Sequence, residues 1–163
     1  MIPVEVSSLA LDSRGEPVVL LRPKAASGEG PVLPIWIGMQ EANAIMLAAQ
    51  GNQAARPMSY DLMARLLLAL DGMVAQVAVT RLEQGTFYAE ITLAAKSGQF
   101  VIDARPSDSI ALAMRVEAPI LVAEEVFTEA GVKLDEPGEA DEEEQVQAFN
   151  EFLEGIDPED FRG

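Results

Sequence analysis

The sequence contains neither cysteine nor histidine among its 163 residues. Without cysteine there are no disulfide bridges and no thiolate metal sites, which suits a reducing compartment. Without histidine there is no imidazole general base, no Ser-His-Asp triad and no histidine-ligated zinc. Any catalysis must therefore use carboxylates, Arg, Lys, Tyr, Ser or a bound metal ion.

Basic residues are scarce, since 11 Lys and Arg stand against 27 Asp and Glu and the net charge is −16. The acidity is concentrated late in the chain, where residues 134–163 hold 12 acids and one base, a net charge of −11. Residues 1–133 hold 15 acids and 10 bases, a net charge of −5. This mildly acidic part does not hold duplex DNA by neutralising charge, so nucleic acid needs a local basic groove or a bridging divalent metal.

Long apolar runs are also missing. No uncharged stretch approaches the roughly 20 residues that a membrane span needs. The first residues lack the basic region and the apolar core of a signal peptide. We therefore expect a cytoplasmic protein without membrane contact.

The composition predicts one domain and an appendage. With 49% hydrophobic residues in the chain, residues 1–133 can bury a core of their own. Residues 134–163 begin with acids, Gly and Pro, which predict a solvated linker. Four apolar residues at helical spacing then predict a short amphipathic C-terminal helix, with a partly ordered tail as the alternative. These four are Val146, Phe149, Phe152 and Leu153.

Apolar periodicity predicts an α+β domain with a mixed, mostly antiparallel sheet and three packed helices. The expected strands are residues 4–11, 17–21, 32–37, 73–82, 86–95, 99–103 and 119–122. The expected helices are residues 41–50, 59–70 and 107–116. The last helix lies between two strands, which indicates one parallel strand-helix-strand crossover. A change of parity in the first strand predicts a bulge near Ser7 and Ser8.

The same periodicity identifies the expected core. The strand of residues 86–95 alternates cleanly, with its inner face formed by Phe87, Ala89, Ile91 and Leu93. The predicted inner face of helix 59–70 consists of Leu62, Leu66, Ala69 and Leu70. Trp36, Phe87 and Phe100 lie in apolar strands and are expected in the core.

Chemistry-bearing residues gather where an apolar strand runs into a helix, at residues 100–113. Pro106 disfavours a helical conformation at Arg105, Ser107 is a good helix cap, and Asp108 lies in the first turn, where the helix dipole favours negative charge. Residues 55–62 repeat this pattern with a second Arg-Pro, a serine and an early Asp61. The simplest interpretation of Asp61 and Asp108 is that they only stabilise helix starts.

Several blocks of the sequence, taken in order and spacing over residues 1–130, carry a family pattern. They are Leu33-Pro34-Ile35-Trp36-Ile37-Gly38, Glu41-Ala42, Arg56-Pro57, Asp61-Leu62, Phe87-Tyr88-Ala89, Asp103-Ala104-Arg105-Pro106-Ser107-Asp108 and Ala118-Pro119-Ile120. This pattern resembles the bifunctional nuclease domain family. The resemblance implies a mixed α/β domain of bacterial and plant proteins, oligomeric and linked to nuclease activity on DNA and RNA. Where the family usually has Thr-His before Asp-Leu, this chain has Ser59-Tyr60, so the imidazole is missing.

The first functional hypothesis is a metal-dependent nuclease, a hydrolase that acts on the phosphodiester bonds of DNA or RNA. The candidate catalytic residues are Asp61, Asp103, Arg105 and Asp108. The candidate ligands for Mg²⁺ or Mn²⁺, which prefer carboxylate oxygens, are Glu41, Asp103 and Asp108. The candidate phosphate-binding residues are Arg56, Arg105 and Ser107.

The second hypothesis is a non-catalytic oligomeric scaffold or regulator whose acidic tail binds a partner. Here Asp103, Arg105 and Asp108 form a structural ion-pair network, and Asp61 pairs with Arg65 along one helix. In both hypotheses the strand edges of the amino-terminal half need covering, so we expect a homo-oligomer, a dimer or larger.

Overall fold

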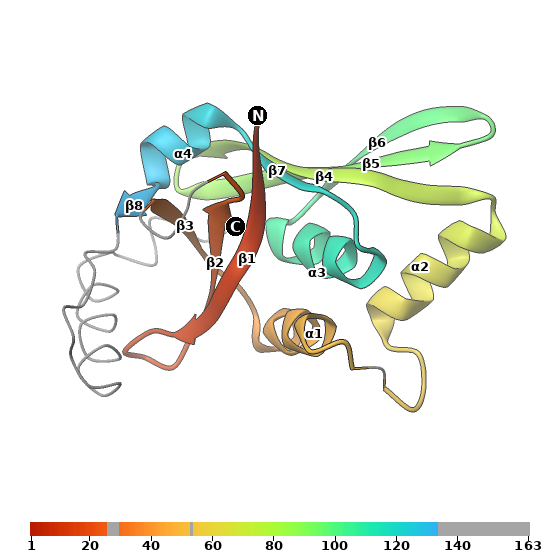
Figure 1. Cartoon of the computed structure of the whole chain (residues 1–163), viewed down its shortest axis with the longest axis horizontal. Helices are drawn as coiled ribbons and strands as arrows, with labels where there is room; N and C mark the ends of the chain where they lie inside the picture. Colours follow the sequence, from red (N-terminus) through yellow and green to blue (C-terminus); the bar gives the residue numbers. More distant parts are fainter. Residues whose placement is uncertain (26–29, 53, 134–163) are drawn as a thin grey trace.

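The computed structural model describes residues 1–25, 30–52 and 54–133, and the predicted acidic linker and C-terminal helix lie outside these residues. The strands are β1 (Ile2–Leu11), β2 (Pro17–Pro23), β3 (Pro31–Trp36), β4 (Gly72–Glu83), β5 (Thr86–Ala95), β6 (Gly98–Ala104), β7 (Ile120–Val122) and β8 (Val132–Lys133). The helices are α1 (Met39–Ala49), α2 (Ser59–Ala69), α3 (Pro106–Val116) and α4 (Glu124–Ala130). The predicted α+β class is confirmed (Figure 1).

The strands form one mixed sheet in the order β6-β5-β4-β7-β1-β2-β3-β8. Among the described strands, β4 and β7 pair in parallel and every other neighbouring pair is antiparallel. The predicted crossover runs from β6 through α3 to β7. It passes over β5 and β4, so that β7 enters the centre of the sheet between β4 and β1.

The helices α1, α2 and α3 lie together on one side of the sheet in Figure 1, and α4 lies apart from them beside β8. The helix α4 is not among the predicted elements; it has seven residues and buries Val126 and Phe127. Its two-turn length is too short for an apolar period to stand out. Among the described residues, no helix is both long enough and apolar enough to cross a membrane.

The hydrophobic core lies between the sheet and the helices. Leu21, Ile35, Phe87 and Ile110 are among its fully buried side chains. The predicted alternation of β5 is confirmed, because Phe87 and Ala89 are buried and Ile91 and Leu93 are partly buried against the core. The register of β1 and β2 shifts between Val6 and Ser8, which confirms the predicted bulge.

Two core predictions are wrong. The stripe predicted to face inward from α2 is exposed, and no residue of that helix is buried. The helix turns Tyr60 and Leu67 toward the core instead, because it packs along α3 and the start of β4 and not flat on the sheet. Phe100 is 46% exposed, because β6 is an edge strand with β5 as its one neighbour in the described sheet.

Candidate functional site

The site begins where β6 ends and α3 starts. Arg105 is the N-cap of α3 in an extended conformation, and Pro106 takes the first helical position, which the missing N–H of proline suits. The predicted cap Ser107 is therefore already inside the helix, where it is buried. With this placement the hydroxyl of Ser107 is not on the surface that a phosphate would approach.

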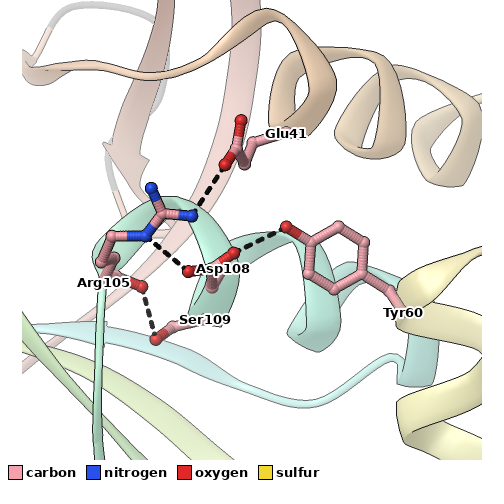
Figure 2. Close-up of polar contacts among 5 residues, drawn as sticks. All are labelled: Glu41, Tyr60, Arg105, Asp108 and Ser109. Carbon is pink, nitrogen blue, oxygen red and sulfur yellow. Dashed lines mark hydrogen bonds and ion pairs between the residues drawn. The ribbon is translucent and has the colours of Figure 1, made fainter.

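Arg105 holds two carboxylates with one guanidinium (Figure 2). Its Nε lies 2.7 Å from Asp108 Oδ2, and its Nη2 lies 2.8 Å from Glu41 Oε1. The hydrogen bond to Asp108 is the main cause that raises the pKa of Arg105 above its usual value, so the group stays charged. The Arg105 side chain is 60% exposed, whereas that of Glu41 is only 15% exposed. No described residue hydrogen-bonds to Nη1.

Glu41 reaches this guanidinium from the first turn of α1. Gly38 is the N-cap of that helix, and a Cβ at Gly38 would collide with the Glu41 carboxylate. The absence of a side chain at Gly38 thus lets Glu41 fold back over the helix start toward Arg105.

Tyr60 joins the cluster from the start of α2. Its hydroxyl donates a hydrogen bond of 2.8 Å to Asp108 Oδ1, the carboxylate oxygen that Arg105 leaves free (Figure 2). Burial raises the pKa of Tyr60 well above its usual value, and the hydrogen bond to Asp108 and the charge of that group raise it further. The phenol is therefore a donor at neutral pH and not a base.

Asp61 lies beside this cluster but is committed to another partner. Its Oδ1 lies 2.7 Å from Arg115 Nε, and its Oδ2 accepts a hydrogen bond of 2.9 Å from the backbone N–H of Met58. The expected partner Arg65 is replaced by Arg115, a residue that the sequence analysis missed. Arg115 follows Asp108 by seven positions, two turns along one face of α3, and this spacing was the available signal.

Asp103 and Arg56 are not brought to Arg105. Asp103 pairs with Glu90 on the neighbouring strand, and strand alternation places both side chains on the face opposite Ile91 and Ile102, away from the helices. Arg56 is exposed in the loop between α1 and α2.

The predicted three-carboxylate metal site is therefore not assembled. Within the described residues, no three or more side chains of Asp or Glu gather so that they could hold a metal ion. Two of the three predicted ligands, Glu41 and Asp108, do lie on either side of one guanidinium. Two carboxylates suit Mg²⁺ or Mn²⁺ where substrate phosphate and water complete the coordination.

The cluster combines one fixed cation with two carboxylates, and it lies at the amino ends of two helices. Arg105 and Asp108 stand at the amino end of α3, and Glu41 at the amino end of α1. Helix amino ends carry partial positive charge and unpaired N–H groups that favour phosphate. The exposed guanidinium can bind a phosphate oxygen while the two acids and Tyr60 hold its orientation.

The comparisons with known proteins agree with the sequence pattern. The chain matches the model of the Bifunctional nuclease domain over residues 19–135. It is 41% identical over 156 residues to the uncharacterized protein Rv1829 of Mycobacterium tuberculosis (strain ATCC 25618 / H37Rv), covering 91% of this chain and 90% of that protein. It is 30% identical to Bifunctional nuclease 2 of Arabidopsis thaliana over 119 residues, 71% of this chain and 36% of the plant protein.

A second plant protein, Bifunctional nuclease 1 of Arabidopsis thaliana, is 30% identical over 131 residues, 78% of this chain and 39% of the plant protein. The matched region contains Glu41, Tyr60, Arg105 and Asp108, the four side chains of the cluster. This chain is therefore a member of the bifunctional nuclease domain family.

Proposed function

We propose that this protein is a nuclease that hydrolyses phosphodiester bonds of DNA or RNA at the Arg105 cluster. One observation carries the proposal. An exposed guanidinium is held between two carboxylates at the adjoining starts of α1 and α3, in a chain whose relatives include two proteins named bifunctional nucleases.

Arg105 binds the scissile phosphate in this proposal. Its Nη1 is available, and a guanidinium places two parallel N–H groups on phosphate oxygens as negative charge develops there. Lysine at this position provides a charge without the planar fork, so it is a weak substitute. Glu41 and Asp108 keep the guanidinium from turning away.

Asp108 and Glu41 supply the acid-base chemistry, because the chain has no histidine. Together with a substrate phosphate they would hold Mg²⁺ or Mn²⁺, which lowers the pKa of a bound water and offsets the repulsion between carboxylate and phosphate. Tyr60 keeps one oxygen of Asp108 hydrogen-bonded and so fixes the direction of the other. Asp103 has no part in this proposal.

The proposed nuclease activity is tested by an assay on single-stranded DNA, double-stranded DNA and RNA. EDTA, Mg²⁺ or Mn²⁺ is added in parallel reactions. We expect cleavage with the metal ions and none with EDTA. Asp108→Asn keeps the size of the side chain but removes its charge, and it should lower kcat by about 10²-fold or more, the usual contribution of an acid-base group.

Asp103→Asn is the matched control. It makes the same change from carboxylate to amide, but Asp103 lies on the face of β6 that points away from the helices. It should leave kcat within about twofold, since surface positions outside the reacting groups rarely alter rate. Equal losses in Asp103→Asn and Asp108→Asn, or cleavage that Asp108→Asn leaves intact, would remove the Arg105 cluster from the reaction.

A non-catalytic role is the second candidate, and one observation favours it. The charged groups of the cluster already have partners within it, since Arg105 binds Glu41 and Asp108, and Tyr60 binds Asp108. These contacts join three helices. Such networks fix geometry without adding much net stability. A purified chain that cleaves none of the substrates, and in which Arg105→Gln loosens the packing of α1 and α2, would support the scaffold role.

A further inference from the structure

The strands β2 and β3 are buried on both of their faces. On one face every second side chain joins the hydrophobic core, and Leu21 and Ile35 are examples. The side chains between them lie on the opposite face of the sheet, because strand residues alternate. We call that face the β2–β3 outer surface. Its members are apolar and buried, and they are Val18, Leu20, Val32, Pro34 and Trp36.

The helices of the described fold do not account for this burial. The core that Ile45 of α1, Ile110 of α3 and Val126 of α4 help to form contains none of these five side chains, and α2 has no buried residue. An antiparallel sheet that is covered on one face normally carries polar residues on the other. The strand β5 follows this rule, since Glu90 and Thr92 alternate with its core residues. The β2–β3 outer surface does not, so another segment of the chain is needed to cover it.

We propose that the C-terminal segment, residues 134–163, covers the β2–β3 outer surface of its own chain. The sequence of the segment suits this role, because four apolar residues at helical spacing form one apolar face. The other stretches outside the described residues are 26–29 and 53, which are short and hold no large apolar side chain. The four apolar residues of the segment are Val146, Phe149, Phe152 and Leu153.

The segment starts beside the surface that it covers in this proposal. The described chain ends at Lys133 in β8, and β8 pairs with β3. Residues 134–145 can span up to about 40 Å when extended, whereas β2 lies two strands from β8, about 10 Å away. A helix of residues 146–153 is about 12 Å long, which matches the width of two or three neighbouring strands.

Charge favours the same placement. Arg22, Lys24 and Lys133 lie at one end of the surface, because β2 and β3 are antiparallel and β8 pairs with the first residues of β3. None of the three forms an ion pair with a described residue, and the buried Nε of Arg22 has no hydrogen-bond partner among them. Buried polar groups usually have partners. The segment that begins here has 12 acids and one base, so its carboxylates can supply them.

Acrylamide quenching of Trp36 fluorescence in full-length proteins tests the proposal. Trp36 is the chain's one tryptophan and belongs to the β2–β3 outer surface. We expect weak quenching in the wild type. Phe149→Glu places a charge in the apolar face of the segment, so quenching should increase and the emission should shift to longer wavelength. The variant should still unfold cooperatively, because the substitution lies outside the described core.

Phe161→Glu is the matched control. It makes the same change in the same segment, but Pro158 separates Phe161 from the apolar face, and proline interrupts a helix. Quenching of Trp36 in this variant should equal that of the wild type. Wild-type quenching in Phe149→Glu, or an equal increase in both variants, overturns the proposal. A wild type in which Trp36 is quenched as strongly as in the unfolded chain overturns it too.

Dilution distinguishes cover by the same chain from cover by another copy. A contact within one chain does not depend on protein concentration, whereas a contact between copies is lost on dilution. Quenching of Trp36 should therefore stay constant over a dilution series of the wild type. An increase on dilution would assign the cover to a neighbouring molecule and would overturn the proposal.

Discussion

At the scale of single residues, Tyr60 stands where the family usually has histidine, and the two side chains offer different chemistry. Histidine exchanges a proton near neutral pH. Tyr60 donates to Asp108 and its pKa is raised, first by burial and then by that hydrogen bond. In this chain the position therefore orients a carboxylate and does not accept a proton.

The raised pKa of Tyr60 has a measurable effect on stability at alkaline pH. The folded pKa lies above the ordinary value of 10.0, so the stabilisation is complete below pH 10 and is lost as the pH rises through the folded pKa. Tyr60→Phe removes this contribution, and its free energy of unfolding should fall less steeply than that of the wild type above pH 10. Denaturant titrations over a pH series measure the free energy of unfolding of the wild type and of Tyr60→Phe. Tyr88→Phe is the control for the loss of one phenol.

Asp12 predicts the opposite dependence, at acid pH. It accepts hydrogen bonds from the backbone N–H groups of Arg14 and Glu16 and from the indole of Trp36. Burial opposes ionisation here, but the bonds from Glu16, Trp36 and Arg14 outweigh it and lower the pKa of Asp12 below 3.8. The stabilisation is present above pH 3.8 and is lost as the pH falls through the folded pKa.

Asp12→Asn should therefore lower the free energy of unfolding at neutral pH by about 1–3 kcal/mol, the cost of impaired hydrogen bonds to a buried charged group. It should also make unfolding less dependent on pH below 3.8. The fluorescence of Trp36, the chain's one tryptophan, reports unfolding in both proteins. A variant as stable as the wild type at neutral pH would show that these three hydrogen bonds contribute little.

The members of the cluster differ in how well they can be predicted from sequence. Arg105 and Asp108 are three residues apart at one helix start, so local sequence alone predicts that they lie close together. Glu41 and Tyr60 lie 64 and 48 residues from the groups they bind, and no local period specifies such contacts. Asp103 differs from these residues. Strand alternation places it on the face opposite Ile102, but the sequence does not show which face of the sheet the helices cover.

At the scale of elements, the site depends on how α1 and α2 are attached to α3. α2 contacts one face of α3 at two points, through Tyr60 to Asp108 and through Asp61 to Arg115. α1 contributes Glu41 from its first turn, in the space that Gly38 leaves open. The cluster is thus a property of three helix starts in one arrangement.

Gly38→Ala tests the contribution of α1. Alanine suits the backbone of Gly38, whose φ is −76°, so folding should be little affected. Its methyl group would collide with Glu41 Oε2, so the carboxylate must shift, and the hydrogen bond from Arg105 to its Oε1 is strained. We expect kcat of the proposed nuclease to fall by about 10-fold to 100-fold, the usual effect of losing a group that orients a site.

Glu41→Gln serves as the comparison for Gly38→Ala, because it removes the charge without moving the helix. Both variants should weaken the site to a similar degree in the same nuclease assay. If Gly38→Ala retains wild-type kcat while Glu41→Gln loses it, the Glu41 side chain has another route to Arg105, and the glycine serves only the turn.

Elements were easier to predict than their orientation. The strands of the β4–β5 hairpin and the three long helices follow from periodicity and from turn residues. The outward turn of α2 does not, because a helix with two apolar faces has no single inner face to predict. The place of β7 at the centre of the sheet is equally hidden, since a crossover specifies direction and not the number of strands it passes.

At the scale of the whole molecule, charge is divided unevenly between the described fold and the rest of the chain. The net charge is −5 for residues 1–133 and −16 for all 163 residues. Phosphate-binding proteins usually gain affinity from positive charge, which makes their binding depend on salt. In the proposed function, the Arg105 cluster attracts phosphate against the negative charge of residues 134–163, which counterions screen beyond about 10 Å at 0.1 M salt.

Removing residues 134–163 should therefore strengthen binding of single-stranded polynucleotide at low ionic strength, and the gain should vanish at high salt. Fluorescence anisotropy over a salt series measures polynucleotide binding by the full chain and by the chain without residues 134–163. A full-length variant with Glu142→Gln, Glu143→Gln and Glu144→Gln removes charge without shortening the chain. Its affinity for the polynucleotide should also rise at low salt, by a smaller factor, and this rise should also vanish at high salt. Equal affinity of all three proteins at low salt would mean that the acidic segment does not oppose the substrate. A gain that persists at high salt would mean that the segment blocks the site by contact and not by charge.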